Sequence, residues 1–594
     1  MFIVRQRGFT RLLLALLLAW PAVSRAQLSY TNDGTAITIT GYAGSDTVLT
    51  VPDTIDGLPI TAIGDGAFAS SALTGIRLGT NIIRIGSGAF AECYGLTSFT
   101  IPAGVTVIEP DVFSDCYGLT NVTLPDGLTD IGDGAFAFCT GLAGVSIPNS
   151  VTNLGIGAFM DCRSLTNVGL GTGVIVIGDQ AFQDCTSLSR VVIPDSVVSL
   201  GYQSFAECYG LSEVTLGRNL DSIGDGAFID CILPGVSIPA SVTRIGISAF
   251  SGCQAVTVES LNAYYSSLDG VLFDKARTLL IQYPLHRAGS YTVPEGVTAI
   301  GGYAFQHCRA LTAVSLPDSV SSIGDEAFQK CTLLTGLRLG TGLTSIGNLA
   351  FQYCIALTNL TMPDGVTNIG ISACYFCTHL ADVTLSRGLS AIPDSAFYNC
   401  PALTRITIPE GVSDIAEFAF FGCFGLTNVT LPDSLTHIGD EAFYYCTSLS
   451  QLTIPAGVTE LGDAVFSDCV SLRQVFFQGD APSAAEDQFD GNANTTVYYR
   501  PGTIGWGDTF ASHPTAVWDV QIVTADGVLG VREGKFGFNV TGTGGLPFVV
   551  EAATDLSSPA WLPLSTNTLT GGPAFFGDPQ WTNNPTRLYR LRMP

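Results

Sequence analysis

Cysteine recurs along the chain with a fixed 23-residue period, and this period is the feature that most constrains the fold. The first series comprises Cys93, Cys116, Cys139, Cys162, Cys185, Cys208 and Cys231, and Cys253 follows one position early. After a longer gap the period resumes at Cys308 and continues to Cys469, with Cys374 outside it. A phenylalanine stands three positions before nearly every member of the series. The pattern predicts stacked equivalent turns, each of which covers the apolar side of its neighbour.

One turn, residues 119–141 (LTNVTLPDGLTDIGDGAFAFCTG), illustrates the unit. Its apolar alternation predicts a short strand, and its Pro-Asp-Gly sequence predicts a tight turn before a second short apolar edge. Asp133 is well placed to N-cap a short helical or 3₁₀ turn. Phe136 and Cys139 are expected to point from that turn into the core. Two strands and a helical turn per unit give an α+β repeat.

The consensus L-x-x-V-x-I-P-x-x-V-T-x-I-G-x-x-A-F-x-x-C-x-x resembles the BspA-type (Treponema-type) 23-residue leucine-rich repeat over residues 61–477. The lead-in at 37–64 and the interruption at 262–284 are also similar to segments of that family. The resemblance implies an α+β repeat solenoid, a leucine-rich-repeat arc with a parallel β-sheet on its concave face. It also implies a secreted or surface protein, adhesin-like in several members, and it brings no catalytic residues.

The first 26 residues have the order of a secretory signal peptide. Arg5, Arg7 and Arg11 form a basic region, residues 12–20 (LLLALLLAW) are apolar, and small residues stand at 24 and 26. A nine-residue apolar run is too short to span a bilayer, so cleavage before Gln27 and export to the cell surface or medium are expected. An uncleaved N-terminal anchor is the alternative interpretation.

Changes in composition divide the remaining chain. The last cysteine is Cys469, and four of the five tryptophans follow residue 500. We expect an N-terminal cap at 27–60, repeat blocks at 61–253 and 295–478, and an irregular, hairpin-bearing interruption at 254–294. A C-terminal cap at 479–520 is expected because the open end of a solenoid must be covered. Alternating runs at 521–594 predict a small all-β, sandwich-like C-terminal module.

Charge and hydropathy exclude several classes of protein. The chain has 25 basic and 51 acidic residues, a formal net charge of −26. A nucleic-acid partner is not expected, because phosphate binding requires a basic surface. No apolar run after residue 26 approaches the ~18 residues of a transmembrane helix. We therefore expect a soluble, monomeric, exported chain.

The recurrent cysteines and aspartates have two interpretations each. One cysteine per turn forms an inward ladder with parallel side chains, a geometry that disfavours disulfides, so most thiols are expected to be reduced, with a few bridges as the alternative. The C-x-x-C at Cys374 and Cys377 lacks the further ligands that zinc needs. Aspartates three residues before the phenylalanine suit capping, with a Ca²⁺ ladder as the alternative. The sequence predicts no catalytic residue, metal or cofactor, hence no enzyme.

The exposed face of the predicted sheet is the best candidate for recognition. Its strands carry a recurrent Thr or Ser position. Thr suits an exposed strand through its β-propensity, and a flat hydroxyl array that binds ice or glycans is the alternative interpretation. Two residues earlier lies a row that varies from turn to turn: Asn121, Asn167, Arg190, Glu213, Asn359, Asp382, Arg405, Asn428 and Gln451. The densest polar cluster of this row is Asn359, Asp382, Arg405, Asn428 and Gln451, and we predict that it contacts an extracellular protein or glycan. A structural scaffold of the cell envelope without a specific ligand is the alternative.

Overall fold

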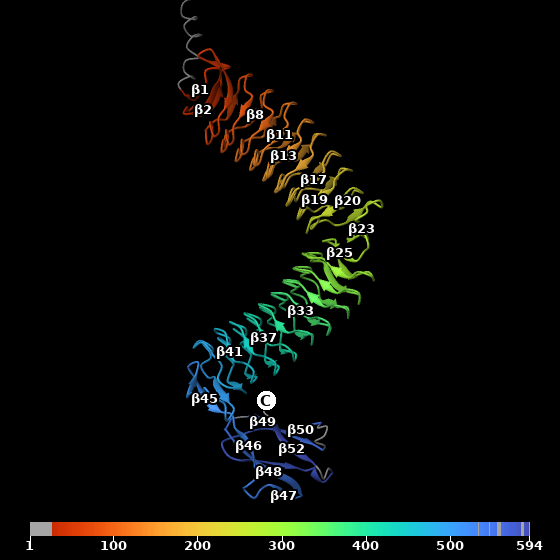
Figure 1. Ribbon diagram of the computed structural model, residues 1–594, viewed down its shortest axis with the longest axis vertical. Helices are drawn as coiled ribbons and strands as arrows, with labels where there is room; N and C mark the ends of the chain where they lie inside the picture. Colours follow the sequence, from red (N-terminus) through yellow and green to blue (C-terminus); the bar gives the residue numbers. More distant parts are fainter. Residues whose placement is uncertain (1–26, 533, 546, 555–559, 584–586, 593–594) are drawn as a thin grey trace, which may run out of the picture. The chain divides into compact units, whose positions relative to one another are not determined.

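The computed structural model describes residues 27–532, 534–545, 547–554, 560–583 and 587–592. The predicted signal peptide, 1–26, lies outside these residues. The chain divides into two compact units, one with residues up to 288 and 296–310, the other with 289–295 and 311–594. Within each unit, successive turns stack on one another, as the colours of Figure 1 show.

In unit 1 each regular turn contributes two short parallel strands. The first strands form a six-stranded sheet of β8 (Ser98–Thr100), β10 (Asn121–Thr123), β12 (Gly144–Ser146), β14 (Asn167–Gly169), β16 (Arg190–Val192) and β18 (Glu213–Thr215). The second strands form a ladder of β9 (Val107–Ile108), β11 (Asp130–Ile131), β13 (Asn153–Leu154), β15 (Val176–Ile177), β17 (Ser199–Leu200), β19 (Ser222–Ile223) and β21 (Arg244–Ile245). The register advances by one full repeat per strand, because Asn121 pairs with Ser98 on one side and with Gly144 on the other.

Irregular elements flank this stack in unit 1. At the N-terminal side lie β1 (Leu28–Asn32), β2 (Ile37–Tyr42), β3 (Val48–Thr50), β4 (Thr54–Ile55), β5 (Leu58–Ile63), β6 (Gly75–Arg77) and β7 (Arg84–Ile85). At the other side lie β20 (Val236–Ile238), β22 (Val256–Val258), β23 (Tyr265–Leu268), β24 (Val271–Asp274), β25 (Leu279–Gln282) and β27 (Ala299–Ile300). Strands β23, β24 and β25 pair antiparallel, so the interruption of the period contains hairpins.

Unit 2 repeats the two-strand turn. Its first strands are β26 (Gly289–Thr292), β28 (Leu311–Ser315), β30 (Gly336–Arg338), β32 (Asn359–Thr361), β34 (Asp382–Thr384), β36 (Arg405–Thr407), β38 (Asn428–Thr430), β40 (Gln451–Ile454) and β42 (Gln474–Phe477). Its second strands are β29 (Ser322–Ile323), β31 (Ser345–Ile346), β33 (Asn368–Ile369), β35 (Ala391–Ile392), β37 (Asp414–Ile415), β39 (His437–Ile438) and β41 (Glu460–Leu461).

The C-terminal part of unit 2 contains longer strands. The parallel sheet continues from β42 into β43 (Thr496–Tyr499) and β45 (His513–Val517), which pairs with β44 (Thr509–Phe510). One antiparallel group then contains β46 (Val520–Val523), β47 (Gly530–Arg532), β48 (Lys535–Gly542) and β51 (Ala574–Asp578). A second contains β49 (Pro547–Ala553), β50 (Leu562–Thr568) and β52 (Leu588–Arg592). Side chains of both groups share one core that includes Phe538, Val550 and Phe576.

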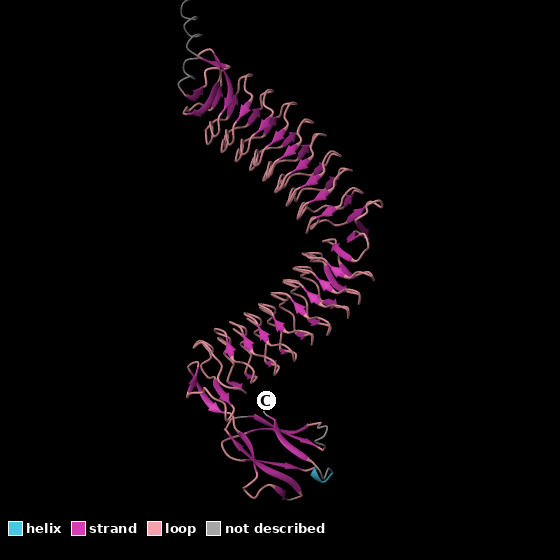
Figure 2. Cartoon of the chain, in the orientation of Figure 1, coloured by secondary structure: helices cyan, strands magenta, loops and turns pink. Residues whose placement is uncertain are grey.

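The predicted α+β class is wrong, because the protein is an all-β solenoid of about twenty turns. Across the described ranges the one helical element is the 3₁₀ turn η1 (Trp581–Asn583), which is cyan in Figure 2. The expected helical turn after Asp133 is instead a series of three overlapping β-turns, in which Gly134 and Phe138 have φ near +60°. Left-handed residues at this spacing interrupt any right-handed helix.

Hydrogen bonding explains why this segment is not helical. An α-helix satisfies its amides within itself. Here the amides of Gly134, Phe136 and Phe138 donate to carbonyls of the next turn, the last to Met160 at 2.7 Å, while the intervening amides bond within their own turn. Every second amide of the segment therefore bonds to the neighbouring turn. The residue pattern of a single repeat does not reveal these bonds between turns.

The aspartate before this segment has a different role from the one predicted. The carboxylate of Asp133 accepts the backbone N–H of Ile156 in the next turn, at 2.7 Å. Asp179 and Asp225 bond in the same way to Tyr202 and Ile247. The helix-capping interpretation is therefore wrong, although the carboxylates do satisfy backbone donors. They join adjacent turns rather than start a helix.

Stacked phenylalanines fill the core. From Phe68 to Phe250 each ring stacks on that of the following turn, with centroids 5.1–5.8 Å apart. Phe136 is fully buried. In unit 2 the ladder includes Phe351 and Phe397, and between them Cys374 takes the phenylalanine position. Aromatic burial is thus a recurrent source of stability in the turns that carry the phenylalanine.

All seventeen cysteines are free thiols and buried. In the regular turns the Sγ donates to a phenylalanine carbonyl of the preceding turn, as Cys139 does to Phe113 at 3.2 Å. The side chain at Ser71, which takes the cysteine position, lies 3.3 Å from the Sγ of Cys93. Burial raises the pKa of Cys423 to about 12, which keeps it protonated. The interpretation of the ladder as reduced, packed thiols agrees with the structure.

Candidate functional site

The five residues predicted to contact a partner begin five consecutive first strands of unit 2. Asn359, Asp382, Arg405, Asn428 and Gln451 open β32, β34, β36, β38 and β40 and are all exposed. The register places Asn359 opposite Asp382 and Arg405 opposite Asn428. The structure therefore brings them together as one row, which we call the polar row.

The polar row contributes little to the fold. Leu360 and Ile406, which follow two of its members, are buried, and the next residues, Thr361 and Thr407, are exposed again. Within the row, Arg405 and Asp382 form an ion pair at 3.5 Å, and their side chains are 77% and 67% exposed. An exposed pair of this kind stabilises a protein by about 0–1 kcal/mol. These side chains are consequently available for contacts with a partner.

Two hollows open on this face of unit 2. One, of about 540 Å³, is lined by Arg405, by Arg387 from the turn after β34, and by Glu410, Thr384 and Thr407, over an apolar floor. The other, of about 350 Å³, is lined by Asn428 and Gln451 among others. Asn359 and Asp382 line neither of these two hollows. Both volumes lie within the range of small-molecule sites.

The equivalent face of unit 1 has a larger hollow, which the sequence reasoning did not single out. It has a volume of about 840 Å³ and is lined by Asn167, Gly169, Arg190, Asp195 and Arg218 among others. Gly169 stands where most strands have a hydroxyl residue, and Gly171 and Gly217 stand where most turns have proline. Gly169 is the sequence signal for the hollow, because it removes a side chain from the wall. Gly171 and Gly217 do not line it, and a Cβ on either would lie 2.2 Å from a proline carbonyl oxygen of the preceding turn.

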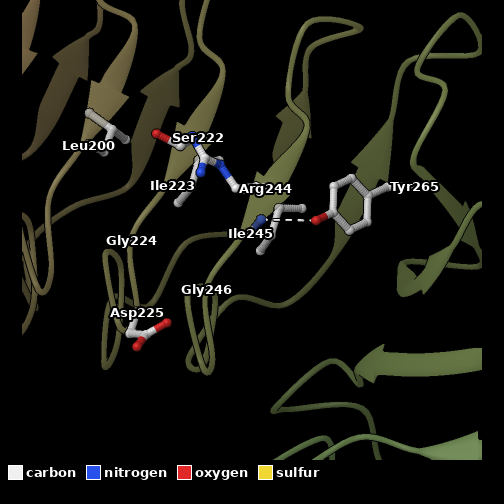
Figure 3. A pocket seen from close by; sticks show the side chains of 9 residues that line it. All are labelled: Leu200, Ser222, Ile223, Gly224, Asp225, Arg244, Ile245, Gly246 and Tyr265. Carbon is white, nitrogen blue, oxygen red and sulfur yellow. Dashed lines mark hydrogen bonds between the residues drawn. The ribbon is translucent and has the colours of Figure 1, made fainter.

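A further hollow lies along the second-strand ladder of unit 1 (Figure 3). The hydroxyl of Tyr265 accepts the backbone N–H of Ile245 at 2.9 Å, the dashed line in Figure 3. Arg244 pairs with Asp221 at 3.4 Å, and Asp225 accepts the N–H of Ile247. Because its polar groups already serve the fold, this hollow is a poor candidate for ligand binding.

The part of the chain that the structure describes offers little other chemistry. There, no three His, Cys, Asp or Glu side chains are grouped so that they could hold a metal ion. Nor do the described residues form a helix of the length and hydropathy that crossing a membrane requires. The aspartates of the calcium interpretation, such as Asp133 and Asp179, instead accept backbone amides.

Three bacterial proteins are among the solved structures that are similar to this chain. A leucine-rich cell surface protein from Faecalibacterium prausnitzii A2-165 is 28% identical, over 71% of this chain and 92% of its own, with a TM-score of 0.37. A leucine-rich repeat protein from Bacteroides ovatus is 22% identical, over 80% and 98%, with a TM-score of 0.37. The pneumococcal vaccine antigen PcpA is 20% identical, over 76% and 92%, with a TM-score of 0.39. No curated protein matches the chain significantly.

The family model for the BspA type leucine rich repeat region, which contains six copies of the repeat, matches four stretches of the chain. These are residues 61–186, 129–257, 286–404 and 390–501, which together cover well over half of the sequence. The periodic Phe and Cys positions, the paired short strands and this match agree with one another. The chain therefore belongs to the BspA-type leucine-rich repeat family.

Proposed function

We propose that the protein is an adhesin-like binding protein, exported to the cell surface or the medium, which recognises an extracellular protein or glycan through its first-strand sheet. The polar row is the main contact. The observation that carries this proposal is that five consecutive strands present exposed polar side chains of different chemistry, while the fold needs none of them.

Physical reasoning supports a surface of this kind. Equivalent positions of stacked strands recur about every 4.8 Å, so five strands offer a continuous strip of roughly 19 Å. Contacts along the strip add up without any deep pocket. Because the row has no large apolar anchor, affinity of a single site is expected to be modest and raised by multivalent presentation.

A direct test exposes labelled mature chain, residues 27–594, to arrays of extracellular-matrix proteins and of glycans. The proposal expects saturable binding to one class, and that binding should be weakened by substitutions in the polar row. Absence of saturable binding, together with retention of the protein in isolated cell envelopes, would favour the scaffold alternative.

A further inference from the structure

Arginine is rare at two positions of the sheet face, and it occurs there in the same arrangement in both units. We define the turn slot as the residue five positions after the first residue of each first strand. Across the regular turns, arginine occupies the row only at Arg190 and Arg405, and the turn slot only at Arg218 and Arg387. In each unit the two arginines lie in adjacent turns. The same pairing of rare residues therefore occurs twice.

The acidic residues of these turns are placed in the same way in both units. Within the row, acids occur only at Glu213 and Asp382, which belong to the turns with arginine in the turn slot. The neighbouring turn slots hold Asp195 and Glu410. Each pair of turns thus forms a two-by-two arrangement of alternating charges.

Each arrangement surrounds one of the two larger hollows on the sheet faces. Arg190, Arg218 and Asp195 line the hollow in unit 1, and Arg387, Arg405 and Glu410 line its counterpart in unit 2. The row acids line neither hollow. Each lining therefore carries two guanidinium groups and one carboxylate, and the row acid beside it balances the charge of the four residues.

The arginines retain capacity to bind. Arg190 pairs with Glu213, and Arg405 with Asp382, at 3.5 Å, and all four side chains are more than half exposed. The exposed side chains of Arg218 and Arg387 form no ion pair with any described residue. A planar guanidinium binds a carboxylate through two parallel hydrogen bonds, so these groups suit a carboxylate ligand.

The remaining lining groups narrow the ligand class. Thr384 and Thr407 line the hollow of unit 2, and Thr172 and Thr215 that of unit 1, each above an apolar floor that includes a proline. The threonine hydroxyls can donate hydrogen bonds to hydroxyl-rich molecules or accept them. Asp195 and Glu410 each accept a backbone N–H of the next turn through one carboxylate oxygen, and the second oxygen can accept from a ligand hydroxyl. An acidic peptide offers a carboxylate but no such hydroxyls.

We propose that each of these hollows binds a carboxylate-bearing sugar unit, of the uronic or sialic acid type. The inference rests on the proposed function, because it names the ligand class of the sheet face. The guanidinium groups hold the sugar carboxylate, and the threonines and the lining acid hold its hydroxyls. Two sites per chain are expected, one in each unit.

Calorimetric titration of the full mature chain tests this with four probes: trigalacturonic acid, 3′-sialyllactose, neutral lactose and a triglutamate peptide. The expected result is that one acidic sugar binds at two sites per chain and that lactose and triglutamate do not bind. The two acidic sugars distinguish a uronic from a sialic source. Arg218→Gln and Arg387→Gln are each expected to weaken one of the two sites at least tenfold.

Arg338→Gln is the matched control, because it removes one exposed arginine from the same face of unit 2 outside the hollows. It should leave both sites unchanged. The inference is overturned if neither acidic sugar binds, if triglutamate binds equally well, or if Arg338→Gln weakens binding as much as Arg387→Gln. Array binding that depends on the polar row, with no acidic-sugar binding, would remove this inference and leave the proposed function standing.

Discussion

Truncation of one core ring, Phe136→Ala, tests how the solenoid is stabilised. The ring is fully buried and stacks between Phe113 and Phe159, with centroid distances of 5.2 and 5.1 Å. Removing it deletes the buried apolar area of one side chain and both stacking contacts. Deleting a buried phenylalanine costs about 3–5 kcal/mol, because the surrounding structure closes only part of the cavity.

The effect should be local, because each turn contacts mainly its neighbours. Hydrogen exchange resolves it: the amides of Phe113 and Phe136, which donate to carbonyls of the next turn at 2.8 Å, should lose about 10²–10³-fold in protection. Amides around Phe420, in unit 2, should keep theirs. Tryptophan fluorescence does not suit this test, since no tryptophan lies between residues 27 and 500.

Phe138→Asp is the matched control, two residues away on the same segment. Phe138 is only half-buried and has a φ of +59°, and the adjacent turns hold Asp115 and Asp161 at the equivalent position. We expect a change within about 1 kcal/mol, because aspartate tolerates a left-handed conformation better than phenylalanine. Equal losses for the two variants, or a loss below about 1 kcal/mol for Phe136→Ala, would refute the stacked-core reasoning.

Three further outcomes are expected. The seventeen buried thiols should resist a thiol reagent in the native chain and all react after denaturation without reductant; intact disulfides found by mass spectrometry would contradict this. Asp133→Ala should lower the stability by about 1 kcal/mol, because it leaves the amide of Ile156 without its acceptor. Asp133→Asn should keep the stability of the wild type, since Asn348 makes the same bond to Ile371. Equal denaturation midpoints for the Ala and Asn variants would contradict this. Burial raises the pKa of Glu551, but hydrogen bonds, led by the one from Arg592, outweigh burial and hold the pKa below its ordinary value. The ionised Glu551 therefore stabilises the fold at pH above the ordinary carboxyl range, and this stabilisation is lost as the pH falls below that range. Tryptophan fluorescence measured against pH should show that Glu551→Gln is less sensitive to acid than the wild type.

The regular part of the fold was predictable because one period controls it. A 23-residue spacing places Phe136 and Cys139 over their equivalents in every turn, and the alternation around Val122 places it inward between exposed neighbours. Strand positions, buried residues and the exposed row therefore followed from the sequence. The polar row itself followed from the reasoning that exposed positions with no packing role are free to vary.

The segment after Asp133 was not predictable in the same way. Gly-Ala-Phe following an aspartate suits a capped helical turn when a single repeat is considered. The actual hydrogen bonds run between turns, and half of the segment's donors, such as that of Phe136, are satisfied there. Non-glycine residues at positive φ, such as Phe138, give no reliable sequence signal.

The arginine-lined hollows were missed for a different reason. The sequence reasoning compared residues within the row, where Arg190 and Arg405 are visible, but did not compare the turn slot. Arg218 and Arg387 stand out only once both positions are aligned by repeat. The hollows themselves depend on side chains of adjacent turns and so required the three-dimensional arrangement.

The most direct test of the proposed function exchanges two charges within the polar row. The double variant Asp382→Arg, Arg405→Asp keeps net charge and a pair of opposite charges while reversing the pattern that a partner meets. The control exchanges Arg84 and Glu109, a pair at 3.3 Å away from the first-strand sheet, whose side chains are 49% and 33% exposed and whose arginine also pairs with Asp65 at 3.0 Å. On the ligand found by the arrays, the first exchange should weaken binding about tenfold or more, with melting unchanged and the control unaffected. Wild-type binding by the Asp382 and Arg405 exchange would contradict the account.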